Sequence, residues 1–121
     1  MIEIHPLSGE NLSQYIAANA LPADATVLMA HENGEEVGSL SLTVSGLAQD
    51  AVASIHTMQA NDVFTEELLI RAAASYAFNR AVPKVTAPKS LHDPVFEKVG
   101  FKTDEQFTSI NTEKVVHFCK K

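Results

Sequence analysis

The segment VFEKVGF, residues 95–101, decides how the rest of the chain is interpreted. It predicts a short helix with Asp93 as its N-cap, Pro94 at the first helical position and Gly100 at the C-terminal end, because these residue types favour those places. Phe101 then opens a strand directly after the helix. The elements around this helix-to-strand joint decide whether it only packs in the core or also belongs to an active site.

The region before the joint predicts a crossover between two strands. Residues 65–81 carry polar side chains at four-residue intervals and are otherwise mostly apolar, which indicates an amphipathic helix lying on a sheet. Thr65 is its expected N-cap, and Pro83 ends it. Residues 84–87 then form a short strand. Strand, helix and strand in this order predict a parallel pair, which is right-handed in nearly all proteins.

The first half of the chain predicts an antiparallel meander. TVLMAHE, residues 26–32, and EVGSLSLTV, residues 36–44, flank Asn33-Gly34, the dipeptide that best fits a two-residue hairpin turn. A third strand is expected over residues 50–58. Before the meander, MIEIHPL, residues 1–7, predicts a short N-terminal strand that Pro6 ends.

Two further regions complete the predicted order of elements. Residues 8–21 show helical spacing between Ser8, the expected cap, and Pro22. After the joint, two antiparallel strands are expected near residues 101–107 and 113–119, with a turn at Asn111 between them.

Length and composition predict a single domain, residues 1–121. The chain is 45% hydrophobic and 20% charged, as in ordinary globular proteins. Its net charge of −6 opposes binding to nucleic acids and to anionic membranes. The single cysteine, Cys119, and the lack of a signal peptide or of about 20 consecutive apolar residues favour the cytoplasm. The final strands, if exposed at an edge of the sheet, could pair between two copies of the chain in a homodimer.

The complete order is strand, helix, three antiparallel strands, helix, strand, short helix and two strands. With EKVGF, residues 97–101, at the helix-to-strand joint, it resembles the GNAT superfamily of acyl-CoA-dependent N-acetyltransferases over nearly the whole chain. The resemblance implies an α/β (α+β) fold with a mixed, mostly antiparallel sheet of about six to seven strands and helices on both faces. It also implies that the sheet splays beside the fourth and fifth strands, where the pantetheine arm of acetyl-CoA would lie.

The chain departs from the family at the loop that holds the coenzyme A pyrophosphate. Active members have R/Q-x-x-G-x-G/A before the main helix, whose N–H groups and dipole bind the phosphates. The corresponding residues 58–69 contain no glycine and no arginine, and this loop is about three residues shorter than is usual. Bulky or acidic side chains stand where the phosphate would approach: Asp62, Val63, Phe64, Glu66 and Glu67.

A second departure concerns the proton donor. In the family motif N-x-x-A-x-x-x-Y-E-K-x-G-F, the tyrosine protonates the departing coenzyme A thiolate. Phe96 occupies that place, so general acid catalysis worth roughly 100- to 10,000-fold would be missing. The motif's asparagine and alanine fall on Lys89 and His92.

Residues outside the motif offer weaker candidates. His56, on the strand before the main helix, is a candidate general base, although a strand histidine with one hydrogen bond is the favoured interpretation. His92 beside Asp93, with the other scattered histidines, gives no metal signal. Cys119 fits a small core residue better than a nucleophile. Small polar residues either line a cleft or form a solvated strand face: Ser39, Ser41 and Thr43.

Two functional hypotheses follow. In the first, the chain is an N-acetyltransferase that delivers acetyl from acetyl-CoA to a small amine without a metal. In the second, it is a catalytically silent GNAT-fold module that binds a small molecule or a protein partner through the same groove. The residues expected to hold the coenzyme are Thr57, Met58, Ala60, Phe64, Thr65 and Phe96.

Overall fold

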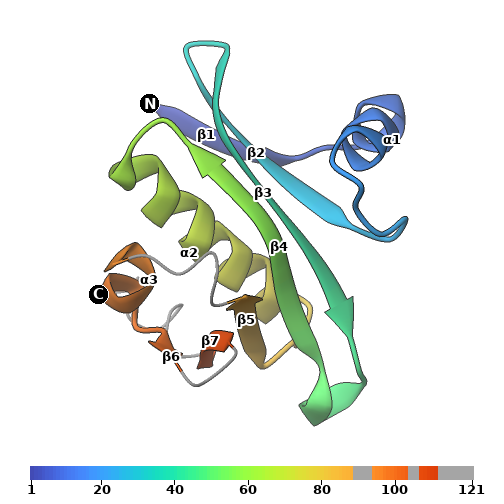
Figure 1. Cartoon of the computed structure of the whole chain (residues 1–121), viewed down its shortest axis with the longest axis vertical. Coiled ribbons are helices and arrows are strands. Elements are labelled where there is room, and N and C mark those ends of the chain that lie inside the picture. Colours follow the sequence, from blue (N-terminus) through green and yellow to red (C-terminus); the bar gives the residue numbers. More distant parts are fainter. Residues whose placement is uncertain (89–93, 104–106, 112–121) are drawn as a thin grey trace.

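A computed structural model describes residues 1–88, 94–103 and 107–111, which form one sheet with helices on both of its faces (Figure 1). Its elements, in chain order, are β1 (Ile2–Pro6), α1 (Gly9–Ala18), β2 (Thr26–Glu32), β3 (Glu35–Ser45), a 3₁₀ turn (Ala48–Asp50), β4 (Val52–Ala60), α2 (Val63–Asn79), β5 (Lys84–Pro88), α3 (Pro94–Val99), β6 (Lys102–Thr103) and β7 (Phe107–Asn111). Over these ranges the sheet has seven strands in the order β1-β2-β3-β4-β5-β7-β6. Only β4 and β5 pair in parallel, so the expected mixed, mostly antiparallel sheet is confirmed.

The predicted meander forms the N-terminal half of the sheet. β2 pairs with β3 across the hairpin turn, where Asn33 has a φ of 56° and Gly34 a φ of 85°. Asparagine and glycine reach positive φ more readily than other residues, so the turn is set by local chemistry. β1 then adds to β2, and β4 adds to β3, both antiparallel.

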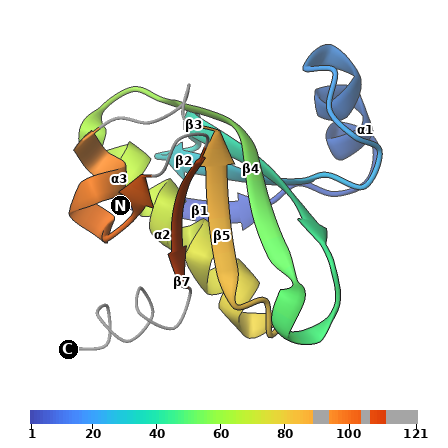
Figure 2. The same cartoon turned by 60° about the horizontal axis from the view of Figure 1, so that its bottom comes forward.

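The two faces of the sheet carry different helices. At Gly38 in β3, an added Cβ would lie 2.8 Å from the carbonyl oxygen of Gln59 and 3.0 Å from the side chain of Leu69, so α2 packs directly on this face. The next residue, Ser39, points to the opposite face because side chains alternate along a strand. There its hydroxyl meets Tyr15 of α1. Figure 2 shows α1 and α2 on opposite sides of the strands.

The core lies between α2, α3 and the sheet, and the VFEKVGF joint is part of it. Phe96 is fully buried and its ring meets Phe101 edge to face, with centroids 5.1 Å apart and an interplanar angle of 76°. Gly100, with a φ of 117°, ends α3. The other large side chains with no exposed surface include Leu40, Leu42, Ile55, Leu69, Ile70 and Val85.

The predicted splay between β4 and β5 is present. The two strands pair only from Val52 to Ser54 of β4, opposite Lys84 to Thr86 of β5, whereas β4 continues to Ala60. In the part of the chain that the structure covers, no strand pairs with this edge of β4 beyond Ser54.

Both long helices begin or end differently from the prediction. α1 stops at Ala18, because the Asn19 side chain donates to the Tyr15 carbonyl oxygen at 2.9 Å and Ala20 turns left-handed with a φ of 52°. Ser8 holds the N-cap position, but its side chain makes no capping hydrogen bond.

The start of α2 was also misassigned. The helix begins two residues early, at Val63, and Asp62 caps it rather than Thr65. Its end at Asn79 falls short of the predicted residue 81, because Ala81 has a φ of 58° and cannot continue a right-handed helix.

The C-terminal prediction was wrong about the turn. Asn111 ends β7, where it pairs with Lys84 of β5, and β6 pairs with β7 before that point. The strand expected at residues 113–119, with Cys119, lies outside the described residues, as do Lys89, His92 and Asp93. None of the helices that the structure describes is long and apolar enough to cross a membrane.

Candidate functional site

A β-bulge in β4 places His56. Ser41 of β3 pairs with Thr57, but the next residue, Leu42, pairs with Ile55, so His56 is an extra residue on β4. Bulges re-aim side chains and occur often beside active sites. The Nε2 atom of half-buried His56 lies 2.8 Å from the Thr43 hydroxyl oxygen. This hydrogen bond matches the interpretation as a strand histidine, and a role as general base stays a prediction.

Ser41 supports the bulge from inside the sheet. Its hydroxyl oxygen accepts the Thr57 backbone N–H at 3.1 Å and lies 2.6 Å from the Thr57 hydroxyl oxygen. Ser41 has no exposed surface and Ser39 is 7% exposed. The idea that these serines form a solvated strand face is therefore wrong, because both are buried and hydrogen-bonded.

The candidate coenzyme-binding residues divide into three places. Thr57, Met58 and Ala60 are partly buried on the part of β4 that lies beyond its pairing with β5. Backbone groups on the β5-facing edge of this segment are therefore not used by sheet pairing within the described residues. The remaining candidates lie in the first turn of α2 and in α3: Phe64, Thr65 and Phe96.

Two residues alone connect β4 to α2, and the second of them occupies the helix N-terminus. The Asp62 carboxylate accepts the Thr65 backbone N–H at 2.8 Å, and this hydrogen bond lowers the pKa of Asp62. Thr65 is 1% exposed, whereas Phe64 is 64% exposed. The capping residue is thus Asp62, whose carboxylate lies at the N-terminus of α2, and the obstruction of a phosphate there stays a prediction.

Glu67 does not face the helix N-terminus, contrary to the prediction. Its carboxylate bridges two helices, with Lys98 Nζ of α3 at 2.9 Å and Arg71 Nε of α2 at 3.0 Å. The Glu67 side chain is 18% exposed. The hydrogen bond from Lys98, followed by that from Arg71, lowers the pKa of Glu67 against the opposing effect of burial.

Glu67→Gln is expected to remove up to about 1 kcal/mol from the free energy of unfolding at neutral pH, because Lys98 is 67% exposed and solvent screens the pair. The folded-state pKa of Glu67 is below its unfolded value, so this stabilisation is full above the ordinary glutamate pKa and is lost as pH falls through the lowered value. Urea unfolding of both proteins from pH 7 downward should show the difference closing below about pH 4. An equal, pH-dependent loss in Glu35→Gln, which removes an exposed carboxylate, would contradict the assignment.

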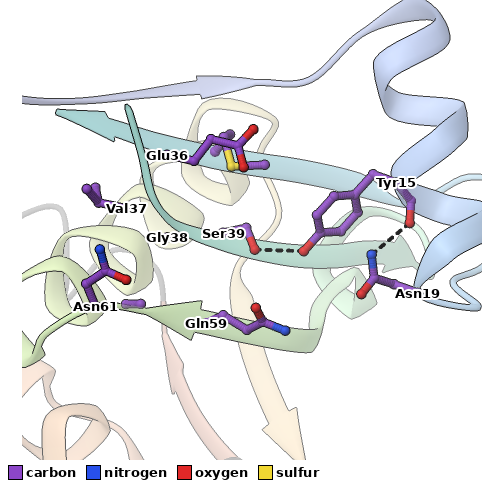
Figure 3. A pocket seen from close by; sticks show the side chains of 10 residues that line it. Tyr15, Asn19, Glu36, Val37, Gly38, Ser39, Gln59 and Asn61 are labelled. Carbon is purple, nitrogen blue, oxygen red and sulfur yellow. Dashed lines mark hydrogen bonds between the residues drawn. The ribbon is translucent and has the colours of Figure 1, made fainter. Parts of the chain in front are cut away.

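An open pocket of about 390 Å³ lies on the α1 side of the sheet (Figure 3). Tyr15 reaches across it from α1, and its hydroxyl lies 2.7 Å from the Ser39 hydroxyl. Gln59 and Asn61 reach it from β4 and from the residues that follow β4. The lining residues are Tyr15, Asn19, Met29, Glu36, Val37, Gly38, Ser39, Gln59, Ala60 and Asn61.

Sequence reasoning missed this pocket except for Ser39 as a cleft candidate and Ala60 as a coenzyme ligand. Tyr15 falls within the helix predicted over residues 8–21, and only its position opposite Ser39 reveals the use of its hydroxyl. Within the described ranges no group of three or more His, Cys, Asp or Glu side chains is placed to hold a metal ion.

Comparison with known proteins finds similar solved structures but no similar sequence. No family profile and no curated protein matches the chain. The spermidine/spermine N-acetyltransferase SpeG of Vibrio cholerae, in mutant form, has a TM-score of 0.72 at 11% identity, over 98% of this chain and 99% of that one. An N-acetyltransferase of Staphylococcus aureus Mu50 has a TM-score of 0.71 at 12% identity, over 93% and 99%.

A third similar structure carries the family name and a ligand. It is a GNAT family acetyltransferase of Elizabethkingia anophelis with acetyl-CoA bound, with a TM-score of 0.67 at 13% identity, over 91% of this chain and 97% of that one. All three likenesses extend over nearly the full length of both chains. The chain therefore has the fold of the GNAT superfamily of acetyltransferases.

Proposed function

We propose that this protein is an acetyltransferase that takes acetyl from acetyl-CoA and delivers it to a small amine. The observation that carries the proposal is the segment of β4 from Ile55 to Ala60, which has a bulge at His56 and, in the described residues, an edge that β5 leaves unpaired. Backbone N–H and C=O groups on such an edge suit the amide-containing pantetheine arm. The similar structure with acetyl-CoA bound supports this choice of donor.

The transfer needs one bond made, one broken and one proton moved. The neutral amine nitrogen attacks the thioester carbonyl carbon, the C–N bond forms and the C–S bond breaks. The proton that the nitrogen then loses passes to the leaving sulfur, so coenzyme A departs as its thiol. An amine that arrives as an ammonium ion must first lose a proton, and His56 is the candidate acceptor in β4. Phe96 offers no hydroxyl to the leaving sulfur, so this chain would depend mainly on positioning of the two reactants.

The α1 pocket supports an amine as the acceptor. Its polar lining consists of the Glu36 carboxylate with hydroxyl and amide groups, and two of its residues, Gln59 and Ala60, come from β4. A pocket of this chemistry can bind an amine, and it meets the proposed donor segment at Gln59 and Ala60. The SpeG structure is that of a polyamine acetyltransferase, which is consistent with an amine substrate.

Two observations favour a second candidate function, a GNAT-fold module that binds without catalysis. The Asp62 carboxylate occupies the helix end where a diphosphate would sit, and Phe96 is buried among apolar side chains. The two candidates differ in whether acetyl-CoA binds and in whether an amine then releases its thiol.

Thermal-shift titration with acetyl-CoA is expected to stabilise the protein by RT ln(1 + [L]/Kd). Asp62→Asn should bind acetyl-CoA several-fold more tightly, because asparagine also caps helices but carries no charge to repel phosphate. Asp50→Asn, at an exposed site, is the control with the same change in net charge. Absence of any shift at millimolar acetyl-CoA would reject the transferase. A shift without thiol release in the presence of a panel of amines would select the silent module.

A further inference from the structure

The charged residues are divided between the two parts of the chain. Residues 1–70 contain ten acidic residues and no lysine or arginine, whereas all nine basic residues lie from Arg71 onward. The α1 pocket is lined only by residues up to Asn61. No lysine or arginine lines it, and its one charged lining residue is Glu36, whose carboxylate favours cations.

A second pocket of about 460 Å³ adjoins the first and extends it between α1 and β2. The two share three residues, Tyr15, Met29 and Glu36. Together they form one groove, here called the α1 groove, with the Glu36 carboxylate at its middle. The second pocket adds Leu7, Asn11, Gln14 and His31.

One amine nitrogen cannot both bind the Glu36 carboxylate and attack the thioester. A nitrogen that attacks a thioester must be neutral, but a carboxylate at hydrogen-bond distance favours the charged ammonium form. Glu36 therefore suits an ammonium group that does not react. The reacting nitrogen would lie farther along the groove, near Gln59 and Ala60 of β4.

We propose that the α1 groove binds a linear amine that carries a second ammonium group, and that Glu36 holds this second group. Met29 lines both pockets but is only 4% exposed, so it gives the methylene chain between the nitrogens a small apolar contact at the base of the groove. The acceptor is thus a diamine or longer polyamine. Naming it the acceptor rests on the proposed transfer, whereas its binding in the groove does not.

Binding of such a ligand would also hold α1 against the sheet. No residue of α1 is buried, and the Tyr15 hydroxyl makes a side-chain hydrogen bond to the sheet at Ser39. Helices of this length are marginal without packing. A ligand that contacts both Tyr15 and Glu36 joins the helix to β3, so amide hydrogen exchange in α1 should slow when the groove is filled.

The test is calorimetric titration at low salt, without acetyl-CoA, so that it does not depend on catalysis. The probes are putrescine, butylamine of the same chain length with one nitrogen, and neutral butanediol. Putrescine is expected to bind and to slow amide hydrogen exchange in α1. Butylamine should bind with about tenfold lower affinity, and butanediol should not bind. Glu36→Gln should weaken putrescine about tenfold and remove its advantage over butylamine.

Glu35→Gln is the matched control, because it removes the neighbouring exposed charge without altering the groove lining. Its affinity for putrescine should stay within about twofold of the unmodified protein. Equal weakening by the two substitutions, equal binding of butylamine, or no binding of putrescine would each overturn the inference. Putrescine that binds as expected but is never acetylated would instead reject the proposed transfer and leave the groove assignment intact.

Discussion

Phe96→Ala is expected to lower the free energy of unfolding by about 3 to 5 kcal/mol, a large part of what holds a domain of this size together. Phe96 has no exposed surface, and its ring lies edge to face on Phe101. Truncation removes the apolar transfer energy and that aromatic contact, and it leaves a cavity that the surrounding residues can fill only in part. Urea unfolding followed by circular dichroism measures the loss.

Phe64→Ala is the matched control for this substitution. Phe64 is 64% exposed in the first turn of α2, so the same truncation there should change stability by no more than about 0.5 kcal/mol. Similar losses at both positions would contradict the assignment of Phe96 to the core. The contrast also bears on function, because this deeply buried ring packs in the core at the place where the motif quoted for the GNAT resemblance has a tyrosine.

His56→Gln is expected to lower the rate of acetyl transfer by about 100- to 10,000-fold, if His56 removes the proton from the amine as proposed. Glutamine can still hydrogen-bond the Thr43 hydroxyl, which lies 2.8 Å from the His56 ring, but it cannot accept a proton at neutral pH. The fold should therefore survive while the chemistry fails. The measurement is the pH dependence of kcat/KM with a fixed amine.

The control for this prediction is His5→Gln, which alters an exposed histidine on β1. The pH profile of the control should match that of the unmodified protein. If His56→Gln keeps both the unmodified kcat/KM and its fall at acidic pH, His56 has a structural role as a hydrogen-bonded residue of the bulge.

Elements set by neighbouring residues were predicted correctly from the sequence. The hairpin at Asn33-Gly34 depends on two residues that tolerate positive φ, and the bounds of β2 agree with those expected. The start of α3 at Pro94 and its end before Gly100 likewise follow from residue types that favour helix ends. The parallel crossover from β4 to β5 follows from the order of the elements.

Choices between equivalent local signals were less predictable. Asp62 and Thr65 are both good capping residues three positions apart, and only the folded backbone shows that Asp62 accepts the Thr65 N–H. At the C-terminal end, Asn111 fits a turn in isolation, but pairing with Lys84 of β5 draws it into β7. In both cases a partner in the folded chain decides between two acceptable interpretations.

The candidate site depends on contacts that sequence spacing does not encode. Tyr15 and Ser39 meet from residues 24 apart, and Glu67 reaches Lys98 on a different helix. The bulge at His56 results from a one-residue shift between two strands, and nothing in the residues around it marks that shift. The splay of the sheet was predictable only through the resemblance to the GNAT superfamily.

The meander of β1 to β4 has a consequence for the order in which the protein acquires its structure. Each of these four strands pairs with the strand that comes before or after it in the chain, and the last of them ends at Ala60, half-way through the sequence. Contacts of short sequence separation form fastest, and a nascent chain folds from its N-terminus. We therefore expect the four strands to pair early and β5 to join them later, together with α2, which covers the apolar face of the sheet.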